Sequence, residues 1–331
     1  MVLLQSGLPK SGNLWLHKIV QESLRLGGTE LKSFIQTQPI YQEAKTWPGF
    51  AEQAGIDFIE VDAGGCYIRK GAYRQPIIDL DEYLSQSTHV WTHALWVPRC
   101  DQVFRKFDKI VYIVRDPRDV AVSASRYYFT PFMLAQHPQQ EPDADTFLKH
   151  RLYEQIFTWV QHLGGYLSHA DEFRIHFIFY ERLLNDFDRE YTRLLAYLGV
   201  KLSAEAFSQV KESARFENMK KQNPHHLRKG ESGGWVNVLT PAQARQVEKI
   251  AGPMMEILRY PLMMSAGDGL PGMPTLIDQG QVRRAMAAAR GGLAEQIRYV
   301  WAFATSRRPV REKLTKGLEY LQRKGRWNSN P

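Results

Sequence analysis

The chain has 331 residues, of which 44% are hydrophobic and 24% are charged, and its formal net charge is +8 at pH 7. This length is enough for one large α/β domain, or two smaller ones, with a well-buried core. Two cysteines, Cys66 and Cys100, provide neither a disulfide framework nor a metal-ligand pattern. No stretch of the sequence comes near to about 18 uninterrupted apolar residues, the length of a membrane-spanning helix. The apolar residues at the start of the chain are too few for a signal peptide. We therefore expect a soluble protein.

The positive charge is concentrated at the C-terminal end. Residues 276–331 contain 12 Lys or Arg and 4 Asp or Glu, which leaves 31 residues of each sign in residues 1–275. A nucleic-acid-binding domain is expected to carry its basic residues on the folded body, interleaved with exposed aromatic residues. Because the body of this chain is neutral, we do not expect nucleic acid as a partner.

The first predicted elements are a buried strand over Val2–Gln5 and a helix from Leu14, where apolar residues recur at helical spacing. The loop between them contains Gly7 and Gly12. Its backbone amides would lie at a helix N-terminus, where unpaired N–H groups and the positive end of the helix dipole bind anions. This segment therefore predicts a phosphate-binding loop.

The loop departs from the P-loop of nucleotide hydrolases. Gly7 and Gly12 have the spacing of the first half of that motif, but Asn13 and Leu14 stand where it has Lys and Ser or Thr, and the cation is Lys10. A magnesium-dependent nucleotide hydrolase with this loop needs the lysine directly after the second glycine and a hydroxyl side chain for the metal. A P-loop kinase or nucleotide hydrolase is therefore the alternative and not the prediction.

Further β-rich runs alternate with helical patterns through residues 1–200. They are Phe58–Val61, His89–His93, Ile110–Val114 and Ile175–Phe179. Such alternation predicts an α/β fold, a P-loop-like three-layer sandwich with a mainly parallel central sheet and helices on both faces. The ligand of such a fold lies at the carboxyl ends of the strands.

A second anion-binding pattern lies in Val111–Ser123. Arg115 follows a predicted strand, and Ser123 lies eight positions later in the following helix. In a strand–turn–helix segment, the side chain of Arg115 at the end of the strand and that of Ser123 on the helix can reach the same anion. The alternative is a structural Arg115–Asp119 ion pair with Ser123 as a capping residue.

A third pattern is Arg228-Lys229-Gly230, within Arg228–Trp235. It places two cations before a glycine, an arrangement suited to a doubly charged phosphate through forked and point-charge contacts.

The three patterns resemble sequence motifs of the sulfotransferases that use 3′-phosphoadenosine 5′-phosphosulfate (PAPS), and they occur along the chain in the same order as in that family. Pro9-Lys10-Ser11-Gly12-x-x-Trp15-Leu16 resembles their 5′-phosphosulfate loop. The resemblance covers most of the chain and leaves out the C-terminal tail. It implies transfer of a sulfuryl group from PAPS to a hydroxyl or amine, with 3′,5′-adenosine bisphosphate (PAP) as product and no metal required.

The resemblance also implies roles for individual residues. Lys10 would be catalytic and stabilise the leaving phosphate, and Ser123 would restrain Lys10 until the donor is bound. The implied donor-binding residues are Lys10, Ser11, Gly12, Asn13, Leu14, Trp15, Arg115, Ser123, Tyr180, Phe216, Arg228, Lys229 and Gly230. The family usually has two hydroxyl residues where this chain has Asn13 and Leu14, and an aspartate where it has Gly234.

The acceptor requires a base near neutrality, and histidine is the usual choice. Thr92-His93 resembles the K-T-H motif of cytosolic sulfotransferases, with Trp91 in place of its lysine. We therefore expect His93 to be the general base. One alternative is that His93 is a hydrogen-bonded structural histidine. Another is a metal site at His89 and His93, but no third ligand has matching spacing, so no metal is expected.

An aromatic segment, Tyr127–Asp145, has no regular period and indicates a lid over the acceptor. Its aromatic residues suit a flat or lipidic alcohol, and the neutral body does not suit a polyanionic glycan. We expect a small-molecule or lipid acceptor, with carbohydrate as the alternative.

The C-terminal part begins with Thr240-Pro241, a helix start from which a helix is predicted to about Arg259. We expect a sulfotransferase domain over 1–264, a linker over 265–275 and a basic helical extension over 276–331. The extension would pack on the domain or a second subunit, or bind an anionic membrane. A catalytically inactive scaffold acting through this tail is the non-enzymatic alternative, which intact Lys10 and His93 argue against. We found no pattern of a signal peptide or of a membrane-spanning helix in the sequence. Together with the resemblance, this favours a cytoplasmic enzyme.

Overall fold

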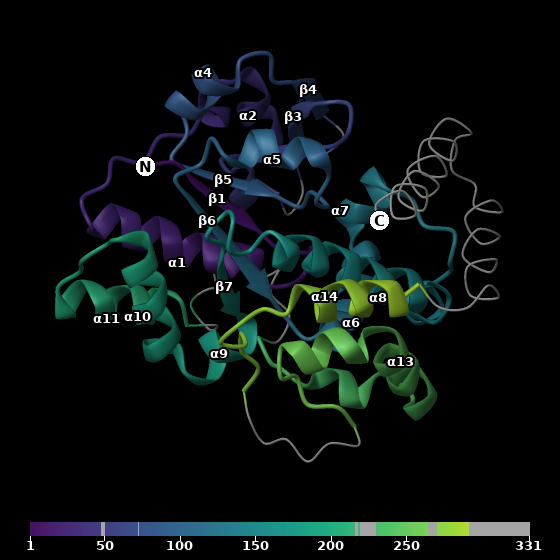
Figure 1. Cartoon of the computed structure of the whole chain (residues 1–331). Coiled ribbons are helices and arrows are strands. Elements are labelled where there is room, and N and C mark those ends of the chain that lie inside the picture. The colour runs from purple at the N-terminus through teal and green to yellow at the C-terminus, as the bar shows by residue number, and fades with distance from the viewer. Residues whose placement is uncertain (48–49, 72, 216–217, 219–229, 264–269, 291–331) are drawn as a thin grey trace.

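The computed structural model describes residues 1–47, 50–71, 73–215, 218, 230–263 and 270–290. Its centre is a sheet of seven strands in the order β4-β3-β2-β5-β1-β6-β7 (Figure 1). Five strands run parallel: β1 (Leu3–Ser6), β2 (Asp57–Val61), β5 (His89–Thr92), β6 (Lys109–Val114) and β7 (His176–Phe179). These are the five runs predicted from the sequence. The expected α/β fold with a mainly parallel sheet is confirmed.

A hairpin that the sequence analysis did not identify closes one edge of the sheet. Its strands, β3 (Cys66–Lys70) and β4 (Tyr73–Pro76), pair antiparallel with β2 and with each other. β4 is largely exposed and contains no run of apolar residues. It therefore lacks the hydrophobic pattern by which the central strands were recognised.

The register of the central strands brings the important loops to one edge. Ser6, the last residue of β1, pairs with Thr92 of β5 on one side and with Tyr112 of β6 on the other. Val114 of β6 pairs with Phe179 of β7. The segments that follow these strands therefore leave the sheet next to one another, as expected for a ligand site at the carboxyl ends of parallel strands.

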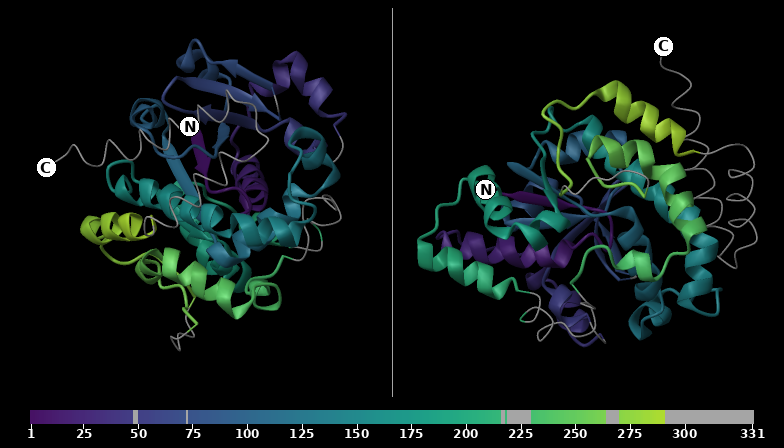
Figure 2. Two further views of the ribbon diagram at one scale, coloured as in Figure 1. Left: turned by 90° about the vertical axis from the view of Figure 1, so that its right-hand side faces the viewer. Right: turned by 90° about the horizontal axis from the view of Figure 1, so that it is seen from below.

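Helices lie on both sides of the sheet (Figure 2). Alternate residues of the strands belong to two different core clusters, one on each side. Leu3, Val111 and Ile113 belong to the core cluster under α1 (Asn13–Leu26), α10 (Phe187–Leu198) and α11 (Ala204–Ser213). Leu4 and Ile110 belong to the opposite cluster. That cluster contains residues of α5 (Pro98–Phe104), α6 (Pro117–Tyr128), α8 (Ala144–Ser168), α13 (Pro241–Ile257) and α14 (Gln279–Ala288).

Shorter helices lie in the connections. They are η1 (Ile35–Thr37), α2 (Pro39–Ala44), α3 (Ala51–Ala54), α4 (Leu80–Ser85), α7 (Pro131–Gln136), α9 (Tyr180–Asn185) and η2 (Gly234–Asn237). The segment predicted as an aromatic lid comprises the end of α6, all of α7 and the chain that leads to α8. Phe132 of α7 stacks on Phe50 with ring centroids 5.2 Å apart, and Met133 is buried. The lid region therefore packs on the segment that precedes α3.

The C-terminal helix α13 begins as predicted, with a reciprocal cap. The Gln243 amide donates to Thr240 Oγ1 at 3.2 Å, and the Thr240 amide donates to Gln243 Oε1 at 2.9 Å. The first turns of the predicted extension form α14, whose Val282 and Met286 are buried against α8 and α13. Residues 291–331 lie outside the described part of the chain.

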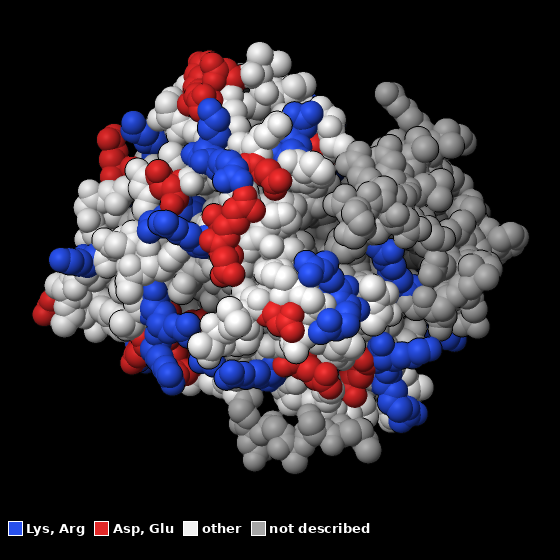
Figure 3. Space-filling model, in the orientation of Figure 1, with Lys and Arg blue, Asp and Glu red and all other residues white. Residues whose placement is uncertain are grey.

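The surface of the described residues mixes both charges. Figure 3 shows Lys and Arg interspersed with Asp and Glu over the face it presents. Among the described helices, none combines the length and hydrophobicity that crossing a bilayer requires.

Candidate active site

A cavity of about 1020 Å³ opens at the carboxyl ends of the strands. The residues predicted to bind the donor and the predicted base lie in its wall together. Those that line it are Lys10, Gly12, Asn13, Leu14, Trp15, His93, Arg115, Ser123, Tyr180 and Gly230. Ser11 is buried beside them in the phosphate loop. Phe216, Arg228 and Lys229 lie outside the described residues.

The phosphate loop depends on two residues in the left-handed backbone region. Lys10 has φ 75° and Gly12 has φ 98°. A Cβ atom on Gly12 would lie 2.7 Å from Cδ2 of Tyr180, too close for any side chain. Glycine is therefore required at position 12 by both its φ and its neighbour.

Asn13 stabilises this loop with its side chain. Its amide Nδ2 donates to the carbonyl oxygen of Leu8 at 2.9 Å, and the Gln5 side chain donates to the Asn13 carbonyl at 2.8 Å. The first α1 hydrogen bond runs from the Leu16 amide to the Gly12 carbonyl. The preceding amides at the α1 N-terminus have no intrahelical acceptor and are oriented to bind an anion. Asn13 therefore presents its backbone amide at the N-terminus of α1, while its side chain shapes the loop.

Lys10 is half-buried in the cavity wall. Its ammonium lies 4.0 Å from the centroid of the Tyr127 ring, and no hydrogen bond joins it to Ser123 among the described residues. Burial, and then the positive charge of Arg115, lower the pKa of Lys10 to about 8. Lys10 therefore remains mostly protonated at pH 7, and the aromatic ring favours its charged form.

His93 leaves the end of β5 beside the phosphate loop. Its Nδ1 lies 2.6 Å from the carbonyl oxygen of Gly7. A carbonyl oxygen can only accept, so Nδ1 carries the proton and Nε2 of the neutral ring has a free lone pair. Burial lowers the pKa of His93 to about 4, and the nearby Lys10 charge acts in the same direction. The imidazole is therefore neutral at pH 7, the state required of a base.

Arg115 connects the phosphate loop to the segment that contains Glu231. Its Nη1 donates to the carbonyl of Lys10 at 3.2 Å, and its Nη2 donates to the carbonyl of Glu231 at 2.9 Å. The guanidinium carbon lies 4.1 Å from the centroid of the Tyr180 ring. Nε is buried and has no hydrogen-bond partner in the part of the chain that the structure describes. A buried donor without a partner is costly.

The alternative interpretation of this motif is not what the structure shows. The Asp119 carboxylate accepts from the amides of Gly233 and Trp235, and among described residues no ion pair joins it to Arg115. The N-cap of α6 is Asp116, so Ser123 lies inside the helix and does not cap it. Ser123 therefore faces the cavity from the second turn of α6.

Two aromatic residues form the wall expected to contact adenine. Trp15 Nε1 donates to the carbonyl of Ala214 at 2.8 Å, which fixes the indole against the end of α11. Its ring meets that of Tyr180 edge to face, with centroids 5.3 Å apart. Tyr180, the first residue of α9, is 6% exposed.

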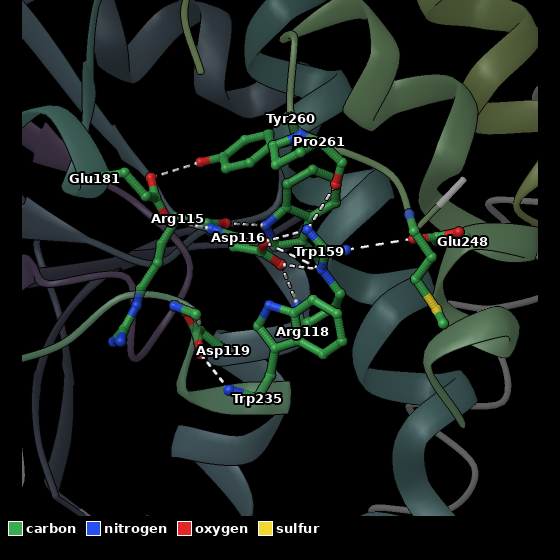
Figure 4. Close-up of polar contacts among 12 residues, drawn as sticks. Arg115, Asp116, Arg118, Asp119, Trp159, Glu181, Trp235, Glu248, Tyr260 and Pro261 are labelled. Carbon is green, nitrogen blue, oxygen red and sulfur yellow. Dashed lines mark hydrogen bonds and ion pairs between the residues drawn. The ribbon is translucent and has the colours of Figure 1, made fainter. Parts of the chain in front are cut away.

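A buried polar network behind Arg115 was not predicted from the sequence (Figure 4). Arg118 is 2% exposed and pairs with Asp116 at 2.6 Å and Glu248 at 3.3 Å. Glu181 accepts from the Asp116 amide at 2.8 Å and from the Tyr260 hydroxyl at 2.9 Å. Burial raises the pKa of Glu181 to about 7. The run of charged residues after β6, Arg115–Asp119, is visible in the sequence and could have indicated such a network. Its partners could not be identified, because they lie far away in the chain.

Lys70 is a second feature that the sequence did not reveal. It lines the cavity from β3, is 2% exposed, and donates to the carbonyls of Gln53 and Ile56. Burial lowers the pKa of Lys70 to about 7. The hairpin that carries it was not predicted, so no pattern connected this lysine to the site.

Trp91 lines the cavity and also takes part in the contact between β5 and α1. Its indole donates to His17 Nδ1 at 2.9 Å, and His17 stacks on His89 with centroids 4.6 Å apart. Trp91 and His89 therefore form part of the contact between β5 and α1.

Comparisons with known proteins agree with this geometry. A family model described as the sulfotransferase domain matches residues 2–259. Sulfotransferase 2B1 of Mus musculus is 27% identical over 286 residues, which cover 80% of this chain and 74% of that protein. The 3-beta-hydroxysteroid sulfotransferase of Cavia porcellus is 26% identical over 260 residues, 73% of this chain and 79% of that protein.

A solved structure shares the fold. The crystal structure of mouse sulfotransferase SULT7A1 complexed with PAP has a TM-score of 0.52 at 23% identity, over 77% of this chain and 83% of that chain. The match of the family model to residues 2–259, together with the phosphate loop and the strand-end arginine, shows that the chain belongs to the sulfotransferase domain family.

Proposed function

We propose that this sulfotransferase transfers a sulfuryl group from PAPS to the hydroxyl of a small-molecule or lipid acceptor. The observation that carries the proposal is that one cavity is lined by the phosphate loop with Lys10, by Arg115, and by a neutral His93. Sulfuryl transfer asks a protein mainly to align donor and acceptor and to neutralise charge on the leaving oxygen. These groups are suited to both tasks.

The donor would lie across the carboxyl ends of β1 and β6. The amides at the α1 N-terminus would bind the 5′-phosphosulfate, and Arg115 with Ser123 would bind the 3′-phosphate. The adenine would lie against Trp15 and Tyr180, and, by resemblance, against Phe216. Arg228, Lys229 and Gly230 complete the 3′-phosphate site that the resemblance implies.

In the proposed mechanism, His93 Nε2 removes the acceptor proton as the acceptor oxygen attacks sulfur. The bond between sulfur and the bridging oxygen of the 5′-phosphate breaks in line with this attack, and Lys10 stabilises the charge on that oxygen. The products are the sulfated acceptor and PAP, and the proton leaves His93 to solvent. The negative charges of the donor would raise the pKa of His93 from its low value and strengthen it as a base.

The acceptor side of the cavity is mainly apolar. Its wall includes Phe50, Phe58, Trp91, Phe132 and Met133. The Phe58 ring lies edge-on to the His93 ring, with centroids 5.2 Å apart. Such a wall suits a hydrophobic alcohol whose hydroxyl reaches His93, and a named relative acts on a hydroxysteroid. Carbohydrates and amines are the alternative acceptors.

Two further proposals concern the location and the partners of the chain. We propose a cytoplasmic enzyme, and we propose that the basic residues of 276–331 bind an anionic membrane or a second copy of the chain. The described start of this region, α14, supports packing on the domain for its first turns only.

The test is calorimetry with PAP in the absence of metal, followed by assays with labelled PAPS and acceptors of three classes. Hydroxysteroids and long-chain alcohols should accept the label, and sugars and amines should accept less. A protein that binds ATP with Mg²⁺ in preference to PAP would be a kinase or hydrolase instead. PAP binding without transfer to any acceptor class would support the inactive scaffold.

A further inference from the structure

The Asp119 carboxylate holds the main chain that follows the basic loop. Asp119 is 5% exposed on α6. Its Oδ2 accepts from the Gly233 amide at 2.7 Å, and its Oδ1 accepts from the Trp235 amide at 3.0 Å (Figure 4). Both carboxylate oxygens are therefore used by a segment more than a hundred positions away in the chain.

The same segment orients Arg115. The carbonyl of Glu231, two residues before Gly233, accepts from Arg115 Nη2 at 2.9 Å. Nη1 of this arginine contacts the Lys10 carbonyl, so Nε is left as the buried donor without a partner among described residues. The direction of the guanidinium plane thus depends on where the Glu231 carbonyl lies.

The short connection from Glu231 to Trp235 leaves little freedom between the two contacts. Gly233 adopts φ 78°, and η2 begins at the next residue. The Trp235 ring lies 4.2 Å from the guanidinium carbon of Arg118, which the buried Asp116 and Glu248 hold in place. The segment is attached to α6 by its amides on Asp119 and by its indole on Arg118.

Among the residues that the structure describes, no cationic side chain forms an ion pair with the Asp119 carboxylate. Burial raises its pKa, and the charge of Arg115 and the two amide hydrogen bonds oppose that effect. Removing the carboxylate would leave two partly buried N–H groups without their acceptor in the protein. Asp119 therefore contributes to fixing the position of this segment.

We propose that Asp119 is the positioning residue of the 3′-phosphate site. It holds the Gly233 and Trp235 amides, and through the Glu231 carbonyl it fixes the orientation of the Arg115 guanidinium in the cavity wall. The inference rests on the proposed function, because it requires a donor with a 3′-phosphate. Asp119 itself does not touch the donor.

The experiment compares two nucleotides by calorimetry on the full chain. PAP carries both phosphates, and AMP lacks the 3′-phosphate. The dissociation constant of AMP divided by that of PAP therefore measures the contribution of the 3′-phosphate. Asp119→Asn keeps the size of the side chain but can accept only one of the two amide hydrogen bonds with its single oxygen. We expect the ratio to fall about tenfold, while the affinity for AMP stays within about twofold.

The control is Glu248→Gln, which weakens the support of Arg118 in the same network without contacting the Gly233 or Trp235 amides. A merely structural role of Asp119 predicts that both variants lower the melting temperature and leave the ratio unchanged. Positioning through Arg115 also predicts that Asp119→Asn and Arg115→Lys are not additive in a double-mutant cycle on the ratio.

The outcomes separate the inference from the proposed function. A wild-type protein that binds PAP no better than AMP would reject the function itself. A wild-type preference for PAP that Asp119→Asn retains in full, or an equal loss for both nucleotides, would overturn the role of Asp119. Should Asp119→Asn not fold, Asp119→Glu displaces both oxygens by one methylene, and an unchanged ratio in that variant is equally decisive against the inference.

Discussion

Nδ1 of His93 donates to the carbonyl oxygen of Gly7 across 2.6 Å, so the proposed base and the phosphate loop are joined directly. The contact arises because Ser6 pairs with Thr92, and the residues that follow these two strand ends lie side by side. It fixes the tautomer of His93 and links the position of Nε2 to that of the loop that would hold the donor.

The first prediction concerns the base. His93→Gln should lower kcat by about 10²- to 10⁴-fold, the usual contribution of a general base. The dissociation constant for PAP should change less than about twofold, because the glutamine amide can still donate to the Gly7 carbonyl. Single-turnover kinetics and calorimetry check the two halves. A variant that keeps its kcat would exclude His93 as the base.

The second prediction is the pH dependence of kcat/KM, which reports the free enzyme. His93 must be neutral and its pKa is lowered to about 4, so activity should rise as the pH increases through about 4. Lys10 must be protonated and its pKa is lowered to about 8, so activity should fall as the pH increases through about 8. Brief assays after a pH jump separate these limbs from unfolding.

The variant Lys10→Arg tests the assignment of the alkaline limb. Arginine stays protonated throughout the range, so the residual activity should no longer fall above pH 8. An alkaline limb that persists in this variant belongs to another group.

The third prediction concerns Gly12. Gly12→Ala should destabilise the fold by about 1–3 kcal/mol, because alanine is strained at this φ and its Cβ would meet Tyr180. PAP binding should be lost with it. Gly252→Ala is the matched control, since this helical glycine of α13 has no atom within 4 Å of the added Cβ. The lower conformational entropy of the unfolded chain favours alanine by about 0.5–1 kcal/mol, but the following Pro253 disfavours a Cβ in the helical region, so the net change in stability should be small. Thermal denaturation with and without PAP measures both, and equal effects would refute the argument.

The fourth prediction addresses Leu14, which is half-buried at the start of α1 where the resembling family usually has a hydroxyl residue. Leu14→Thr should tighten PAP binding by about threefold to tenfold through one added hydrogen bond. The valine of Leu14→Val has nearly the same shape as threonine but no hydroxyl, so this variant should not bind PAP more tightly than the wild type. If the two variants bind PAP equally, the side chain at position 14 does not contact the phosphate.

Features of the chain that depend on near neighbours were predictable. The apolar run before Gly7, the spacing of Gly12 from Lys10 and the cap at Thr240 are local patterns, because strand, turn and helix propensities act over a few residues. The five parallel strands followed from them, and with these strands came the expectation that Arg115 and His93 reach the same edge. The sulfotransferase family was predicted from the resemblance of three motifs, each of which is a short local segment of the sequence.

Features that join distant segments were not predictable. The β3–β4 hairpin, the burial of Lys70 and the contacts of Asp119 with Gly233 and Trp235 depend on strand register and helix packing. The sequence alone allowed an Arg115–Asp119 ion pair, and the folded chain replaced it with two amide hydrogen bonds. Side-chain partners are chosen by burial, because a buried polar group must find a partner wherever the fold places one, and the chain's linear order does not specify that place.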